Sequence, residues 1–205
     1  MRKTALLLLA LAGSLAAASA GAATSPSVTI SASRPVVVFG QGVTLSGAVS
    51  NRKAGETVTV SAEPFGKTVF SDLATATTTT RGAWSFAVKP TIQTAYRATW
   101  NTSTSSAATV KVRPLVVLKL VSAATGTLSV TVTGERAFAG KYVLVERLTS
   151  TGVTVLKHVT LDASSSATFT VRLHRGLSRF RAVIPTSQAA PGYITGMSNV
   201  VAVRR

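Results

Sequence analysis

The chain has 205 residues, no cysteine, and 22 Lys and Arg residues against 6 Asp and Glu, which gives a formal net charge of +16. The absence of cysteine excludes a disulfide-stapled fold, so stability has to come from apolar cores. So large a basic excess favours anionic partners, although a basic surface also serves solubility alone.

The first residues have the three parts of a secretory signal. A positive start, Arg2-Lys3, precedes an apolar run at residues 5–15, which is too short to span a bilayer stably. Small residues at positions 18–20 then form a cleavage site. We expect residues 1–23 to be removed, and an uncleaved anchor helix is the alternative. The sequence therefore predicts a protein that is secreted or associated with the cell envelope, without a transmembrane segment after cleavage.

Short segments with a period of two follow the signal. Val58, Val60 and Ala62 alternate with polar neighbours, as in a strand with one buried face. Residues 75–80 form a polar, β-branched run that suits an edge strand. Glycine and proline separate the segments, and no long helical period occurs after the signal. This pattern predicts an all-β sandwich fold.

The string of strands occurs twice. Residues 55–60 match 140–145, residues 96–98 match 180–182, and residues 110–113 match 201–204. A period of that length corresponds to a whole small β domain rather than to a solenoid unit. We therefore expect two tandem domains, 24–113 and 114–205, with a hinge near Pro114. Residues 185–196 look like a long loop that proteases would cut early.

Three runs in the first copy carry a resemblance to a known family. Val36–Gly47, Gly82–Phe86 and Thr94–Ala98 resemble the bacterial immunoglobulin-like repeats of secreted and surface proteins. The second copy is similar, but it lacks the Gly-x-Trp pair and has Phe180 in place of Tyr96. The resemblance implies an immunoglobulin-like sandwich in each copy and a spacer, adhesive or wall-associated role. It supplies no catalytic residues, and it makes Tyr96 a candidate for the tyrosine corner of such sandwiches.

Groups suited to catalysis are sparse. A Ser/His/Asp triad would need His158 or His174 beside Asp72 or Asp162, and no nucleophile-elbow pattern brings them together. The six carboxylates are scattered, and the histidines lack the spacing of metal ligands. We expect a protein that is not an enzyme and that needs no cofactor or metal.

The two tryptophans have two interpretations. Trp84 and Trp100 have the ring size of sugar-stacking platforms. However, Trp84 shares its face of the strand with Phe86, and Trp100 shares its face with Tyr96. This parity favours core packing for both side chains.

One face of the second copy differs from its counterpart in the first. If the valines at 143 and 145 point inward, then Tyr142, Leu144 and Glu146 point outward, and the same rule turns Arg179, Arg181 and Val183 outward. The face is apolar and basic where the first copy is polar, which is typical of an interface. Packing against the first domain, or a strand register shifted by one, are the alternatives. The predicted binding surface comprises Tyr142, Leu144, Arg179, Arg181 and Arg204, with Val200 at its margin.

Two functions fit these features. The first is a secreted, non-catalytic tandem immunoglobulin-like protein with a structural or adhesive role at the bacterial cell envelope. The alternative is a polyanion-binding module that recognises a wall polymer through the basic face of the second domain. The expected partner is an anionic cell-wall polymer or another surface protein, and not a specific nucleic acid. Charge-driven binding falls steeply with salt, which separates the two.

Overall fold

The computed structural model describes residues 26–205, so the expected signal and its cleavage site lie outside the described residues. This part of the chain is nearly all β, with seventeen strands, a 3-10 turn at Thr80–Gly82 and one short helix, α1 (Thr186–Ala189). The predicted all-β class is confirmed. Within residues 26–205 there is no helix with the length and apolarity needed to cross a membrane.

The N-terminal half (residues 26–113) is a sandwich of two sheets. One sheet has the order β1-β3-β6, and the other has the order β2-β9-β7-β4-β5 with β8 paired to β7. The strands are β1 (Ser31–Ala32), β2 (Val36–Val38), β3 (Val43–Ala48), β4 (Thr57–Pro64), β5 (Ser71–Thr77), β6 (Ala83–Val88), β7 (Thr94–Trp100), β8 (Ser103–Thr104) and β9 (Ala108–Arg113). Strand β5 pairs with β4 alone, as the polar run at residues 75–80 predicted for an edge.

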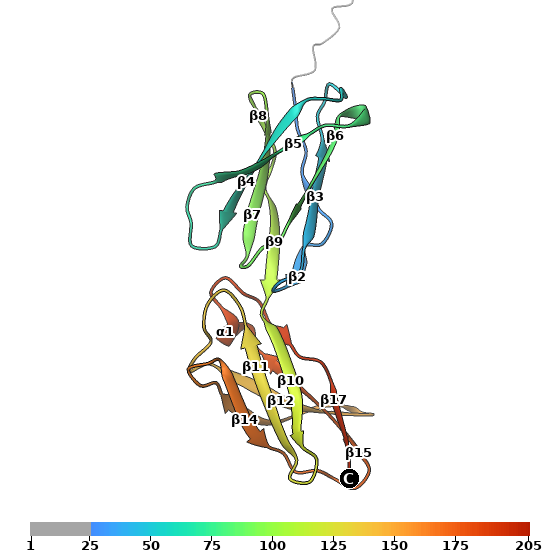
Figure 1. The fold of residues 1–205 in the computed structure, drawn as a ribbon, viewed down its shortest axis with the longest axis vertical. Helices are drawn as coiled ribbons and strands as arrows, with labels where there is room; N and C mark the ends of the chain where they lie inside the picture. Colours follow the sequence, from blue (N-terminus) through green and yellow to red (C-terminus); the bar gives the residue numbers. More distant parts are fainter. Residues whose placement is uncertain (1–25) are drawn as a thin grey trace, which may run out of the picture.

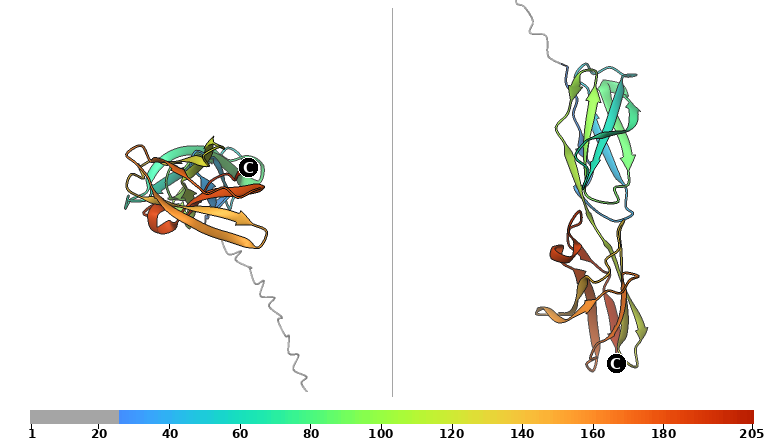
Figure 2. Two further views of the ribbon diagram at one scale, coloured as in Figure 1. Left: turned by 90° about the horizontal axis from the view of Figure 1, so that it is seen from below. Right: turned by 90° about the vertical axis from the view of Figure 1, so that its left-hand side faces the viewer.

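The C-terminal half (residues 114–205) repeats this arrangement. Its sheets have the orders β10-β11-β14 and β13-β12-β15-β16, and β17 also pairs with β15. The strands are β10 (Leu115–Ser122), β11 (Thr127–Thr133), β12 (Tyr142–Thr149), β13 (Gly152–Thr160), β14 (Ser166–Thr170), β15 (Leu177–Ile184), β16 (Gly196–Met197) and β17 (Val201–Arg204). Among the described residues no sheet combines strands from both halves, and the halves lie end to end (Figures 1 and 2).

Alternation places the core of each half between its two sheets. Val58 and Val60 on β4 are fully buried, and so are Val143 and Val145 at the matching positions of β12. Trp84 and Trp100 are 3% and 4% exposed, which confirms that both are core residues rather than sugar platforms. The indole Nε1 of Trp100 donates to a carboxylate oxygen of Glu56 at 3.0 Å, so its polar atom is satisfied.

Gly47 shows why the N-terminal sandwich needs a residue without a side chain at one point on β3. A β-carbon there would lie 1.8 Å from the carbonyl oxygen of Thr29 and 2.9 Å from Nε1 of Trp84. Such a contact with backbone cannot be relieved by a side-chain rotation, because the chain before β1 would have to move away from β3. Glycine at this position therefore lets the N-terminal segment pack closely on β3 and over Trp84.

The same irregularity recurs in both halves. The pairing of β4 with β5 shifts register between Val60 and Ser61, and that of β12 with β13 shifts between Val145 and Glu146. The two bulges occupy matching positions of the repeat. A bulge changes the local twist and displaces the following side chains relative to the edge strand. In each half the residue after the bulge, Ser61 or Glu146, is polar and is covered by side chains of the neighbouring strands.

The segment from Pro185 to Gly196 is not the open loop that its composition predicted. It contains helix α1 and is anchored by Ala189 and Tyr193, which are almost completely buried. Apolar burial and hydrogen bonds hold the segment, and early proteolysis there stays a prediction. The backbone N–H of Gln93 donates to the carbonyl of Gly192 at 3.0 Å, so the segment also touches the N-terminal half.

The junction at Pro114 is bridged rather than free. Strand β9 ends at Arg113 and β10 begins at Leu115, with buried Pro114 between them. Five hydrogen bonds join the two halves across this point: Gln93 to Gly192, Ile194 to Val112, Arg113 to Thr195, Thr91 to Glu135 and Tyr193 to Thr91. These hydrogen bonds brace the connection at which the sequence predicted a hinge.

Tyr193 is central to this brace. Its hydroxyl donates to the carbonyl of Thr91 at 2.6 Å and accepts from the backbone N–H of Glu135 at 2.7 Å, and burial raises its pKa. Tyr96 does not show the role expected of it. It is buried, and among the described residues its hydroxyl contacts the side chain of Thr94 rather than the backbone group that a tyrosine corner requires.

Candidate functional site: the outer face of the C-terminal sheet

The predicted binding surface lies on the outer face of the β13-β12-β15-β17 sheet. Strand pairing sets three rows of outward side chains across this face: Leu144 opposite Val183, Glu146 opposite Arg181, and Leu148 opposite Arg179. Paired residues of antiparallel strands project to the same side. The register confirms the predicted direction of Leu144, Arg179, Arg181 and Val183, so the strand alignment was not shifted by one.

The five predicted site residues fall into separate groups along this face. Tyr142 and Leu144 lie at the start of β12, toward the N-terminal half, whereas Arg179 and Arg204 lie near the opposite end. The ring of Tyr142 stacks on that of His158, with centroids 4.7 Å apart and planes 6° apart. Leu144 is half-buried. The structure therefore brings together Arg179 and Arg204, but not the complete set.

Arg181 is engaged by a carboxylate. Its Nε lies 2.6 Å from Oε2 of Glu146, and the two side chains are 29% and 11% exposed. Glu146 thus points to the outer face as expected, but it is 9% exposed because Arg181 and the neighbouring strands cover it. The pair neutralises the middle of the face, so Arg181 does not contribute a free charge there.

Val183 is also less accessible than expected. It is 7% exposed, because it lies between Leu144 on β12 and Met197 on β16 in the same row of the sheet. The rest of the face keeps an apolar character. Five aliphatic side chains on it are each about half exposed: Val153, Val155, Leu177, Met197 and Val200. The prediction of an unusually apolar outer face is therefore supported by residues that the sequence analysis had mostly left out.

A shallow hollow opens where this face meets the end of the half. It has a volume of about 420 Å³ and is lined by Arg147, His174, Leu177, Arg179 and four residues next to them in the chain. The Arg147 guanidinium is fixed there. One terminal nitrogen donates to the carbonyl of Arg172 at 2.7 Å, and the other contacts the ring of His174. The guanidinium carbon Cζ of Arg147 lies 5.7 Å from the centre of the Phe180 ring. Arg147 therefore covers the end of the core that is remote from the N-terminal half.

Sequence reasoning missed the cations around this hollow. Arg147, Arg172, Arg175 and Arg205 gather with Arg179 and Arg204 at the end of the C-terminal half that is remote from the N-terminal half. A simple signal was available, because residues 163–205 contain no Asp or Glu. Alternation gives Arg147 the inward parity of Val145, and the unshifted pairing of β12 with β15 places it opposite buried Phe180, so it was not expected among the surface cations.

The residues considered for catalysis are dispersed. The Ser61 hydroxyl donates to Asp72 at 2.9 Å in the N-terminal half, while both histidines lie in the C-terminal half. Asp162 accepts from the hydroxyl and the N–H of Ser164, which lowers the pKa of that carboxyl. Within residues 26–205 there is no group of three or more His, Asp and Glu placed to hold a metal ion.

Comparisons with known proteins give a distant structural likeness. No family model and no curated protein matches the chain. Among solved structures the chain is similar to the tetra-tandem repeat in the extending region of a large adhesion protein, with 16% sequence identity and a TM-score of 0.38. The likeness covers 87% of this chain and 49% of the other, so the chain spans about half the length of that neighbour.

Proposed function

We propose that the protein is an exported, non-catalytic structural or adhesive protein of the bacterial cell envelope. In this proposal residues 1–23 are the signal, and residues 24–113 and 114–205 are two tandem immunoglobulin-like domains. The sheet orders support that assignment. Each half pairs a three-stranded sheet with a larger sheet that contains a crossover, β4 beside β7 or β12 beside β15, as in immunoglobulin-like sandwiches.

The observation that carries the proposal is the braced end-to-end arrangement. Five hydrogen bonds cross the boundary, and a β-carbon at Gly192 would lie 2.5 Å from Cδ1 of Ile92, which indicates close packing there. Two sandwiches held in line form a rod, and a rod can act as a spacer between whatever binds at its two ends. The elongated outline in Figure 1 fits a spacer of this kind.

Cell fractionation of the producing bacterium tests this role. We expect the mature protein, with its N-terminus between residues 21 and 24 by mass spectrometry, in the envelope fraction or the medium. Deleting residues 2–15 serves as the control and should leave the protein inside the cell. An intact Met1 on wild-type protein in the cytoplasm would contradict the proposal.

A second candidate function is polyanion binding through the basic face of the C-terminal half. The distribution of charge favours it, since Arg179 and Arg204 lie among further arginines with no carboxylate side chain in residues 163–205. Binding to isolated cell wall should then weaken steeply as salt rises. A variant at Arg181 would also break the ion pair of that side chain with Glu146. Arg179→Glu with Arg204→Glu is the cleaner variant, because neither side chain has a carboxylate partner among the described residues.

A further inference from the structure

The free end of the C-terminal half is a single continuous surface. We define it as the turn at residues 122–127, the segment at residues 171–179 and Arg204-Arg205. Backbone hydrogen bonds hold these pieces together: the N–H of Val171 donates to Gly126 at 2.9 Å, and Gly176 and Arg205 exchange two bonds of 3.2 Å. A β-carbon at Gly126 would lie 2.3 Å from the carbonyl oxygen of Val171, so the turn packs tightly against the segment.

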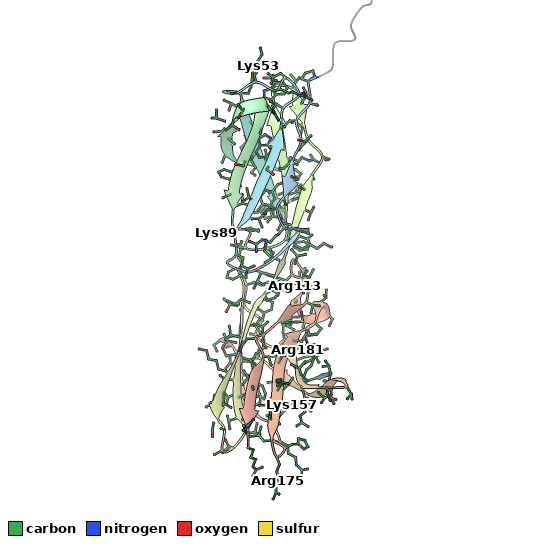
Figure 3. The ribbon with its side chains drawn as sticks, turned by 90° about the vertical axis from the view of Figure 1, so that its right-hand side faces the viewer. Lys53, Lys89, Arg113, Lys157, Arg175 and Arg181 are labelled. Carbon is green, nitrogen blue, oxygen red and sulfur yellow. The ribbon has the colours of Figure 1, made fainter. Side chains whose placement is uncertain are left out.

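This free end carries arginines that have no carboxylate side chain as a partner among the described residues. Its exposed arginines are Arg172, Arg175, Arg179, Arg204 and Arg205. Figure 3 shows Arg175 at the extreme end of the molecule, pointing away from the sandwich. The acidic residue of the neighbouring sheet, Glu146, is engaged by Arg181. If the free ends of two copies met, these arginines would face the same arginines of the other copy and repel them. Charge complementarity therefore requires an anionic partner.

Exposed aliphatic side chains at the same end narrow the choice of partner. Val121, next to the turn, is 59% exposed, and Leu177, at the start of β15, is 50% exposed. A hydrated anionic polymer offers nothing to cover them. The boundary between headgroups and acyl chains of a bilayer does, because it takes up aliphatic groups while anionic headgroups attract adjacent cations.

We propose that the free end docks onto an anionic lipid bilayer. Leu177 and Val121 enter the headgroup boundary, and the five arginines bind lipid phosphates. The guanidinium group suits this task because its planar fork can donate two hydrogen bonds to one phosphate. Nucleic acid is a poorer match, since single-strand binders stack bases on exposed aromatic rings and both tryptophans are buried in the other half. The inference rests on the proposed function only in that export would bring the protein to a membrane surface. Binding of the purified protein to a bilayer can be measured without it.

Co-sedimentation with vesicles tests the proposal. Purified protein is mixed with vesicles of phosphatidylglycerol and phosphatidylcholine in equal parts, or of phosphatidylcholine alone. We expect binding to the first and little to the second. Arg175→Glu with Arg179→Glu should weaken binding on the order of 30-fold or more, because each basic residue near an anionic surface contributes a factor of about five. Lys67→Glu with Lys111→Glu makes the same charge change on exposed residues of the N-terminal half and should leave binding close to wild type.

A second pair of substitutions separates a bilayer from a soluble polymer. Leu177→Ser with Val121→Ser should weaken vesicle binding on the order of tenfold, and it should leave retention on a heparin column unchanged. Equal binding of this variant and wild type to vesicles would overturn the proposal in favour of a soluble anionic polymer. Equal losses of vesicle binding in the arginine variant and the lysine control would show that only the net charge matters. That result would also overturn the proposal. Thermal unfolding of each variant checks that the fold is retained, and none of these results depends on where the cell places the protein.

Discussion

The two halves share the order of their main strands, β5-β4-β7-β9 and β13-β12-β15-β17, but treat matching positions differently. At the position after the bulge, Ser61 in the N-terminal half donates to Asp72, whereas Glu146 in the C-terminal half pairs with Arg181. Phe86 on β6 is partly exposed, whereas Phe169 on β14 is 7% exposed. The repeat therefore conserves the backbone design while the side chains specialise each half.

Lys157 explains part of the difference between the two phenylalanines. It extends from the edge strand β13 to the other sheet, where its Nζ donates to the carbonyl of Thr170 at 3.4 Å and lies 5.9 Å from the centre of the Phe169 ring. This side chain closes the side of the C-terminal sandwich. On the corresponding side of the N-terminal half, Phe86 and the half-exposed Leu73 line an open hollow of about 360 Å³. The sandwich is therefore closed between β13 and β14 in the C-terminal half, but it is open between β5 and β6 in the N-terminal half.

The largest difference should appear when the two phenylalanines are truncated. We expect Phe169→Ala to lower the free energy of unfolding by about 3–4 kcal/mol, near the usual cost for a buried aromatic residue. Phe86→Ala should cost about half as much, because part of the ring already lies in water. Urea unfolding followed by tryptophan fluorescence and circular dichroism measures both. Equal losses would show that the apparent opening in the N-terminal half has no energetic meaning.

The residues after the two bulges should differ by a smaller amount. Glu146→Ala removes the partner of Arg181, which is only partly exposed, and we expect a loss of about 1–2 kcal/mol in unfolding free energy. Ser61→Ala removes a hydrogen bond to the exposed carboxylate of Asp72 and should cost below about 1 kcal/mol. The double variant Glu146→Ala with Arg181→Ala tests coupling, and its loss should be smaller than the sum of the two single losses.

Tyr193→Phe should weaken the brace without changing either core. The substitution removes the hydroxyl that bonds to Thr91 and Glu135, so we expect a loss of about 1 kcal/mol and faster hydrogen exchange at the Glu135 amide. Tyr142→Phe is a matched control, because its hydroxyl has no hydrogen-bond partner among the described residues and its ring would still stack on His158. Unchanged exchange in the Tyr193 variant would mean that this hydroxyl does not protect the Glu135 amide.

The smallest expected effect concerns acid. Hydrogen bonds from Trp100 and then from Asn51 lower the pKa of Glu56 below its ordinary value. A carboxyl whose pKa is lowered by folding stabilises the fold above its unfolded pKa, and this contribution is lost as the pH falls through the folded pKa. Trp100→Phe should therefore raise the pKa of Glu56 in an NMR titration. Asp162 in the other half serves as an internal reference and should titrate as before.

Alternation was sufficient to predict the fold class, the buried valines and the direction of most outward residues. Alternation did not predict the ion pairs and hydrogen bonds that join side chains on different strands. The sequence shows Glu146 and Arg181 as two residues far apart, and only the sheet register makes them a pair. The docking of residues 185–196 was hidden for a similar reason, because Gly192 and Tyr193 find their partners near Thr91, about a hundred residues away along the chain. The cations at the free end were visible in the composition, but their gathering depends on how the last strand returns beside β15.

The braced junction should hold the two halves in a fixed arrangement across Pro114. Because the chain has no cysteine, Lys111→Cys and Thr168→Cys place one spin label on each half without further changes. Pulsed electron paramagnetic resonance then measures the distribution of the distance between the labels. The braced junction predicts a single narrow distribution, which broadens when Tyr193→Phe is added. A broad distribution in the otherwise wild-type protein would contradict the account, because the connection would then act as a hinge.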